Sequence, residues 1–141
     1  MHRVVLDTNV IASGVITPAG PPGAILLAWK ERRLDLVVSP ALLREVADIL
    51  NRPKLARTYG LTADAVSGVL LLLRSQAICT SGTLAIPRTA RDPRDDHILA
   101  CAVEGHADYI VSGDDDLLSL GRHADIPIVR PGTYVRVLEE R

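Results

Sequence analysis

The stretch that decides the fold lies near the N-terminus, where residues 3–7 read Arg-Val-Val-Leu-Asp. Residues 3–6 are mostly β-branched or apolar, which predicts a short strand buried on both of its faces. Strands of this kind occur in parallel sheets that are covered by helices. The run ends at Asp7, so the Asp7 carboxylate should project from the carboxyl end of the sheet, where open α/β sheets bind their ligands.

Apolar strands and helices alternate along the rest of the chain. Residues 8–23 contain three Pro and three Gly and are predicted to form a flexible loop. Ser39-Pro40, Thr62 and Asp92-Pro93 each read as the beginning of a helix. Further strands are expected at residues 34–38, 77–80, 109–112 and 126–129, and helices at residues 24–32, 40–52, 62–75, 93–104, 114–120 and 131–140. This order predicts one domain, residues 1–141, with a parallel sheet covered on both sides.

The charge of the chain is close to neutral, with 16 basic and 17 acidic residues. No overall positive field therefore marks the chain as a nucleic-acid binder. A balanced charge does not exclude such a partner, because metal ions held by several of the acids would make the local field more positive.

The two cysteines and the N-terminal segment indicate a cellular compartment. Cys79 and Cys101 are lone thiols, expected to be small buried residues in the reducing cytoplasm. The first strand follows the N-terminus without a charged and apolar leader, and no apolar run approaches the length of a membrane span. We therefore expect a cytoplasmic protein without a membrane partner.

Acidic residues gather at four separated points, and three of these follow a strand or begin a helix. The points are Asp7, Glu45, the group Asp92, Asp95 and Asp96, and the group Asp114, Asp115 and Asp116. Converging carboxylates repel one another unless protons or a hard cation lie between them, and at neutral pH a divalent ion is the expected answer. Each acid also has a purely structural interpretation, as a turn residue or helix cap.

Helical periodicity ranks the acids within the helices. Glu45 comes three residues after Leu42 and four before Ile49, which places it at the border of the core face. Asp95 precedes Ile98 by three residues and therefore shares the face that packs on the sheet, whereas Asp96 lies about 100° further round the helix. Asp95 is the first candidate and Asp96 a close second, while Asp92 is expected to be the N-cap.

The last acidic group follows a strand. One of its three Asp residues is expected to cap the next helix, and Asp114, nearest the strand, is expected to face the crevice. Ser112 is expected either to donate a hydrogen bond to a neighbouring carboxylate or only to end the strand, and Asn9 and Asp116 are candidate supporting residues. The four His residues show no spacing that indicates a relay, so we interpret each as an ordinary residue.

Three arginines lie in the loop that leads to Asp95. Arg88, Arg91 and Arg94 are candidates for contacts with the phosphates of a nucleic-acid backbone. The alternative is a solvated loop in which they pair with nearby Asp side chains.

The acids and their surroundings, in this order, resemble the PIN domain. The residues that carry the resemblance are Val4-Val5-Leu6-Asp7-Thr8-Asn9, Glu45, the segment 92–102 (Asp-Pro-Arg-Asp-Asp-His-Ile-Leu-Ala-Cys-Ala) and the segment 109–117 (Tyr-Ile-Val-Ser-Gly-Asp-Asp-Asp-Leu). They span nearly the whole chain. The similarity is closest to the branch of toxins from toxin–antitoxin systems that are related to the VapC ribonucleases.

This resemblance implies a three-layer α/β/α sandwich with a mostly parallel central sheet of four to five strands. It also implies a ribonuclease whose Mg²⁺ or Mn²⁺ is held by Asp7, Glu45, Asp95 or Asp96, and Asp114, and whose products carry a 3′-hydroxyl and a 5′-phosphate. RNA as substrate, an antitoxin as partner and a homodimer belong to the same expectation. The alternatives are a PIN-like module that binds RNA or protein without catalysis and, ranked low because Asn9 stands where a second Asp is needed, an aspartyl phosphatase.

Overall fold

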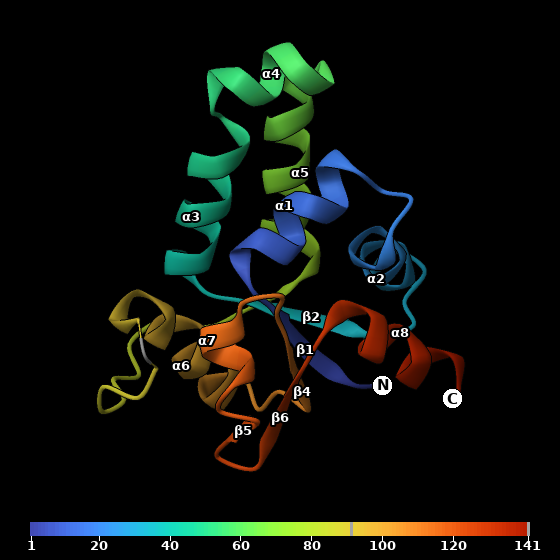
Figure 1. Cartoon of the computed structure of the whole chain (residues 1–141). Coiled ribbons are helices and arrows are strands. Elements are labelled where there is room, and N and C mark those ends of the chain that lie inside the picture. Colours follow the sequence, from blue (N-terminus) through green and yellow to red (C-terminus); the bar gives the residue numbers. More distant parts are fainter. Residues whose placement is uncertain (91, 141) are drawn as a thin grey trace.

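The fold is built on a six-stranded sheet with the order β3-β2-β1-β4-β6-β5 (Figure 1). The computed structural model describes residues 1–90 and 92–140. The strands are β1 (Arg3–Leu6), β2 (Asp35–Val38), β3 (Ile78–Cys79), β4 (Tyr109–Val111), β5 (Arg122–His123) and β6 (Ile126–Val129). All neighbouring strands are parallel except β5, which runs antiparallel to β6. The prediction of a mostly parallel sheet is confirmed, and the two-residue strand β5 adds one strand to the expected number.

Helices cover the sheet and extend beyond it. They are α1 (Thr8–Ile16), α2 (Pro21–Lys30), α3 (Pro40–Leu50), α4 (Pro53–Tyr59), α5 (Ala63–Gln76), α6 (Asp96–Glu104), α7 (Asp115–Leu118) and α8 (Pro131–Glu139), with a 3₁₀ turn at Pro93–Asp95. Ser39 and Thr62 cap α3 and α5 as predicted, because their side chains accept hydrogen bonds from backbone amides of the first turn. Figure 1 shows α1 and α2 on one side of the strands and α6 on the other, which is the three-layer arrangement.

The prediction of a loop at residues 8–23 was wrong, because most of this segment is helical. Asp7 caps α1, and Pro21 begins α2 at a position where proline fits a helix. Gly23 is required by packing and not by flexibility: a Cβ atom there would lie 1.9 Å from the carbonyl oxygen of Pro18. The glycines and prolines of this segment therefore allow two helices to cross closely.

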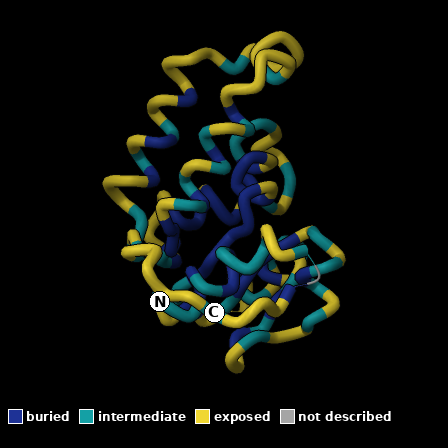
Figure 2. The backbone as a smooth tube through the Cα atoms, turned by 90° about the vertical axis from the view of Figure 1, so that its left-hand side faces the viewer, coloured by how far each residue is buried: buried dark blue, intermediate teal, exposed yellow. Residues whose placement is uncertain are grey.

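Helix α4 is a second element that the sequence did not predict. It begins at Pro53 and ends at Gly60, whose φ of 66° is the left-handed conformation that favours glycine. None of its residues is buried. Together with α3 and α5 it forms an arm that projects away from the sheet, and its exposed backbone lies at the far end of the molecule in Figure 2.

The core lies around the central strands. Val4, Val5 and Leu6 of β1 are fully buried, and Tyr134 of α8 is among the largest fully buried side chains in a chain without Phe. Both cysteines are free thiols; Cys101 is buried as expected, but Cys79 is exposed, because it lies on the edge strand β3. Burial raises the pKa of the Cys101 thiol to about 11.

Within the described residues, no single helix has both the length and the apolar character needed to cross a membrane. Helices α1 and α2 reach that length only as a pair bent by 89°.

Candidate metal centre

The site lies at the point where the strand order of the sheet reverses, between β1 and β4. From β1 the chain adds β2 and β3 on one side and then β4 on the other, so a crevice forms between the carboxyl ends of β1 and β4. Leu6 of β1 is in register with Val111 of β4. The residues that follow, Asp7 and Ser112, therefore lie side by side.

Asp7 is buried and held by two hydrogen bonds from different segments. Its Oδ1 accepts the backbone amide of Val10 at 3.0 Å, which caps α1, and its Oδ2 accepts the hydroxyl of Ser112. The expected bond from Ser112 to a neighbouring carboxylate is thus present. Asp7 is 5% exposed. Burial raises the pKa of the Asp7 carboxyl above its ordinary value, while the bond from Ser112 opposes this shift.

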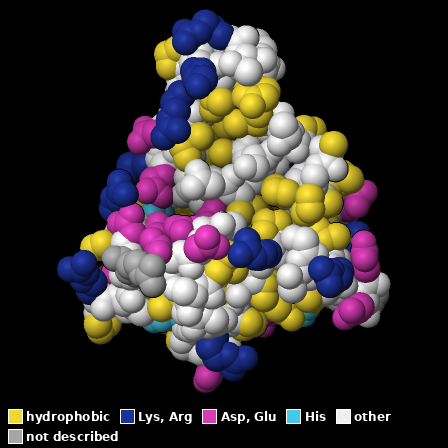
Figure 3. All heavy atoms as spheres, viewed as in Figure 1, with side chains coloured by type: hydrophobic (Ala, Val, Ile, Leu, Met, Phe, Trp, Pro, Cys, Tyr) yellow, Lys and Arg dark blue, Asp and Glu magenta, His cyan; other side chains and the backbone are white. Residues whose placement is uncertain are grey.

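A pocket of about 420 Å³ opens above Asp7. Its lining includes the carboxylates Asp7, Glu45, Asp48, Asp92, Asp95 and Asp114, together with Thr8, Asn9, Ile49, Arg52, Arg94 and Ile98. Figure 3 shows acidic side chains gathered below the arm, in the part of the surface where the arm meets the sheet. The structure therefore brings one candidate from each of the four acidic points of the sequence to a single pocket.

Asp95 is the most perturbed acid of this pocket. Its Oδ2 is buried and has no hydrogen-bond partner among the described residues. Burial raises the pKa of Asp95 to about 7, and contact with the Asp114 carboxylate adds to the shift, followed by the charges of Asp92 and Asp7. Asp95 is thus placed where a proton or a cation must compensate its charge.

Asp96 lies outside this pocket and has a different role. Its carboxylate accepts the backbone amide of Ala90 at 2.7 Å and the amide of Thr89 at 3.3 Å. These bonds fasten the loop before the 3₁₀ turn to the beginning of α6. Of the Asp95–Asp96 pair, the structure therefore directs Asp95 toward the other acids, as helical periodicity predicted, and Asp96 toward the backbone.

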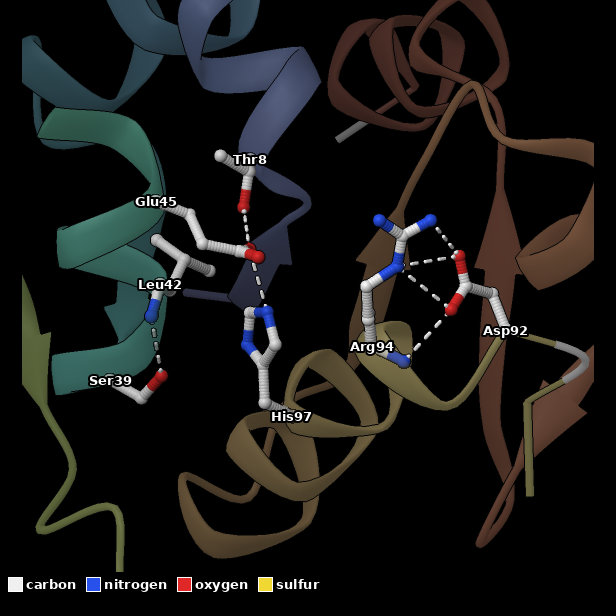
Figure 4. A network of polar contacts seen from close by, with 7 residues as sticks. All are labelled: Thr8, Ser39, Leu42, Glu45, Asp92, Arg94 and His97. Atoms are coloured by element: carbon white, nitrogen blue, oxygen red, sulfur yellow. Dashed lines mark hydrogen bonds and ion pairs between the residues drawn. The ribbon is translucent and has the colours of Figure 1, made fainter. Parts of the chain in front are cut away.

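Glu45 reaches the pocket from α3 and is fixed from two sides. Its Oε1 accepts the hydroxyl of Thr8 at 2.8 Å and lies 2.7 Å from Nε2 of His97 (Figure 4). With Oε1 occupied by these partners, Oε2 is the oxygen left for a ligand. His97 connects α6 to α3 in this way, and its buried Nδ1 has no partner among the described residues.

The three candidate arginines and Asn9 differ in whether they line the pocket. Arg94 lines the pocket but grips Asp92 in a forked ion pair with a shortest distance of 2.8 Å, as Figure 4 shows. Arg88 is exposed on the loop before the 3₁₀ turn, and Arg91 lies outside the described residues. Asn9 lines the pocket.

The acids that follow β4 divide between the pocket and the surface. Asp114 caps α7 by accepting the backbone amide of Asp116 and also lines the pocket. Asp116 is not among the pocket residues. Asp115 is 89% exposed in its side chain and pairs with Arg130.

Four pocket neighbours were missed by sequence reasoning: Thr8, Asp48, Arg52 and His97. Thr8 and Asp48 had a local signal, because each lies next to a candidate or one helical turn from it. His97 had none, since its partner Glu45 is 52 residues away in the chain. A histidine whose only partner is distant in sequence cannot be distinguished from an ordinary one by spacing.

The donor set of the pocket fits a hard divalent cation. Carboxylate oxygens are the ligands that Mg²⁺ and Mn²⁺ prefer, and the buried Oδ2 of Asp95 without a partner is the atom that most needs one. The described residues contain no group of three or more His, Cys, Asp or Glu side chains already closed into a metal-binding cluster. Magnesium usually keeps several waters and binds through one or two carboxylates, so a closed cluster is not required.

A family model for the PIN domain matches residues 3–116, and the chain therefore belongs to the PIN domain family. Members of this family are generally nucleases. The chain is 32% identical over 118 residues to the uncharacterized protein MJ1680 of Methanocaldococcus jannaschii, a match that covers 84% of this chain and 74% of that protein.

Solved structures with the same fold share little sequence with the chain. VapBC2 from Rickettsia felis, bound to a DNA fragment from its promoter, superposes with a TM-score of 0.57 at 15% identity, over 91% of this chain and 98% of that one. FitAcB from Neisseria gonorrhoeae superposes with a TM-score of 0.52 at 15% identity, over 92% of this chain and 98% of that one. At such identities the likeness establishes the fold alone.

Proposed function

We propose that this protein is a metal-dependent endoribonuclease and the toxin component of a toxin–antitoxin system. The observation that carries the proposal is the pocket at the β1–β4 crevice, where Asp7, Glu45, Asp95 and Asp114 meet from four separate segments. Ordinary surface acids have no reason to converge at a place where their charges repel one another. The likeness of the fold to VapBC2 and FitAcB supports the toxin assignment and a protein antitoxin as the partner.

In this proposal the ligands of a Mg²⁺ or Mn²⁺ ion are Asp7, Glu45, Asp95 and Asp114. A bound ion of this kind supplies an activated water and neutralises charge that develops on the phosphate. Ser112 fixes the orientation of Asp7, while Thr8 and His97 fix that of Glu45. Because the pKa of Asp95 is about 7, this carboxyl exchanges its proton near neutral pH, and a bound cation would favour the charged form.

The direct test is cleavage of RNA by the purified protein. We expect cleavage of single-stranded RNA with Mg²⁺ or Mn²⁺, products with 5′-phosphate ends, and loss of activity when EDTA removes the metal. Gel analysis of end-labelled RNA measures all three. If no RNA is cut and calorimetry detects no Mn²⁺ binding, the chain is the non-catalytic PIN-like module instead.

Removing the imidazole of His97 is expected to weaken metal binding. In His97→Ala the Glu45 carboxylate keeps Thr8 as a partner but loses the contact from α6, so about tenfold more Mn²⁺ should be needed for half-maximal cleavage. His97→Gln keeps a side-chain N–H donor and should recover most of this loss. A metal titration of cleavage measures the effect, and an unchanged titration in His97→Ala would show that Glu45 needs no support from α6.

A further inference from the structure

The acidic pocket poses an electrostatic problem for any RNA substrate. Six carboxylates line it, and the two arginines beside them are Arg52 and Arg94. Arg94 is already paired with the Asp92 carboxylate, to which its Nε and one terminal nitrogen donate hydrogen bonds. Arg52 is thus the pocket cation that remains available for a phosphate.

Arg52 is the first of three exposed basic residues on the arm. It precedes α4, and Lys54 and Arg57 follow on α4 itself; we call these three residues the basic row. Lys54 and Arg57 are three positions apart, so they lie on one face of the helix. Figure 3 shows Lys and Arg side chains aligned along one edge of the arm, above the acidic cluster.

The basic row has no structural task that would explain it. Within the described part of the chain, its members form no ion pair. No residue of α4 is buried, so these side chains do not cover a core. The segment 51–60 contains three basic residues and no acid, although the whole chain has 16 basic and 17 acidic residues.

We propose that the basic row binds the phosphates of single-stranded RNA next to the phosphate that is cleaved. The inference rests on the proposed nuclease function and names the surface that guides its substrate. The basic row is continuous with the acidic pocket, because Arg52 belongs to both, and this supports the proposal. Single-stranded RNA is favoured because the reactive acids are recessed, with Asp7 only 5% exposed, and a flexible strand reaches a recessed site where a rigid duplex does not.

The test compares two triple variants that remove the same charge. One is Arg52→Gln, Lys54→Gln, Arg57→Gln; the control is Lys30→Gln, Arg122→Gln, Arg136→Gln, whose residues are exposed on α2, β5 and α8 away from the pocket. Glutamine has nearly the helix propensity of the residues it replaces, and circular dichroism verifies folding of both. Fluorescence anisotropy measures binding of a labelled single-stranded oligouridylate in EDTA over a range of salt concentrations.

We expect the basic-row variant to bind RNA about 30-fold more weakly than the wild type at low salt, while the control changes little. The slope of log affinity against log salt should become shallower by about 2, the value for three contacts with a single strand. Equal losses in both variants, or equally strong binding of duplex RNA that depends on the row, would overturn the proposal. So would unchanged RNA binding with weakened binding of polyglutamate, which would assign the row to an acidic protein.

This experiment separates the basic row from the nuclease function. If the wild type cleaves RNA but the basic-row variant binds RNA as tightly as the control variant does, the RNA-binding role of the basic row is refuted and the nuclease function is retained. If RNA binding depends on the basic row but the wild type cleaves no RNA with either metal, the nuclease function is refuted and the basic row remains an RNA-binding surface.

Discussion

Asp95→Asn is expected to lower RNA cleavage about a thousandfold and, at the same time, to stabilise the metal-free protein. The loss of cleavage follows because an amide cannot replace a charged ligand for a cation that positions water and phosphate. The gain in stability follows because the partly buried Asp95 carboxylate lies beside Asp114 and its buried Oδ2 has no partner among the described residues. At pH 8 we expect a gain of about 2 kcal/mol in the free energy of unfolding, a value reduced for partial exposure to solvent.

Asp95 lowers the stability of the folded protein more as the pH rises. The pKa of Asp95 is about 7 in the folded protein and 3.8 in its ordinary state. Between these values the folded protein holds a proton that the unfolded chain has lost, so stability from this group falls as the pH rises from about 4 to about 7. The advantage of Asp95→Asn should therefore be present at pH 8 and vanish near pH 4. Thermal and urea denaturation in EDTA measure it.

Two matched variants make the comparison specific. Asp96→Asn weakens the acceptor for the amides of Thr89 and Ala90, so it should lower stability by about 1 kcal/mol, opposite in sign to Asp95→Asn. Asp115→Asn, next to Asp114 but exposed, should change neither stability nor cleavage appreciably. Wild-type cleavage by Asp95→Asn would remove Asp95 from the ligand set.

Gly23→Ala is expected to destabilise the protein by about 3 kcal/mol, through backbone crowding and not through the site. The new Cβ would lie 1.9 Å from the Pro18 carbonyl oxygen, so the turn between α1 and α2 must move. Gly68→Ala is the matched control, because a Cβ at Gly68 meets nothing within 4 Å. That helical substitution should stabilise the protein by about 0.5 to 1 kcal/mol.

Differential scanning calorimetry of the two alanine variants checks this pair. A midpoint near the wild-type value for Gly23→Ala would show that the turn at Pro18 relaxes without cost. The comparison isolates packing, since both substitutions add the same methyl group to a helix and differ only in what that group meets.

Sequence reasoning succeeded where the signal was local. The β-branched run before Asp7 predicted β1 and the position of the acid, and the spacing of Asp95 from Ile98 predicted that the two lie on one side, where both line the pocket. It failed where the cause lies in distant contacts. The loop predicted at Gly23 is wrong because the close approach of Gly23 to Pro18 arises only from the packing of α1 against α2.

The site itself shows the same division. Each acid could be proposed from its own surroundings, since strand ends and helix beginnings are recognised over a few residues. The support that orients Glu45 could not, because Thr8 and His97 come from segments on either side of it in the chain. Local patterns therefore found the charged groups, and only the fold showed how they are held.

The crevice between β1 and β4 determines when the acidic pocket can form during synthesis of the protein. Asp7 leaves the ribosome more than one hundred residues before the strand beside it and the serine that orients it, at 109–112. Until then the first strand lacks its central neighbour and the carboxylates remain scattered on an incomplete chain. The acids can meet only after residues 109–114 have left the ribosome, so a ribosome that has not yet translated this segment carries no assembled site.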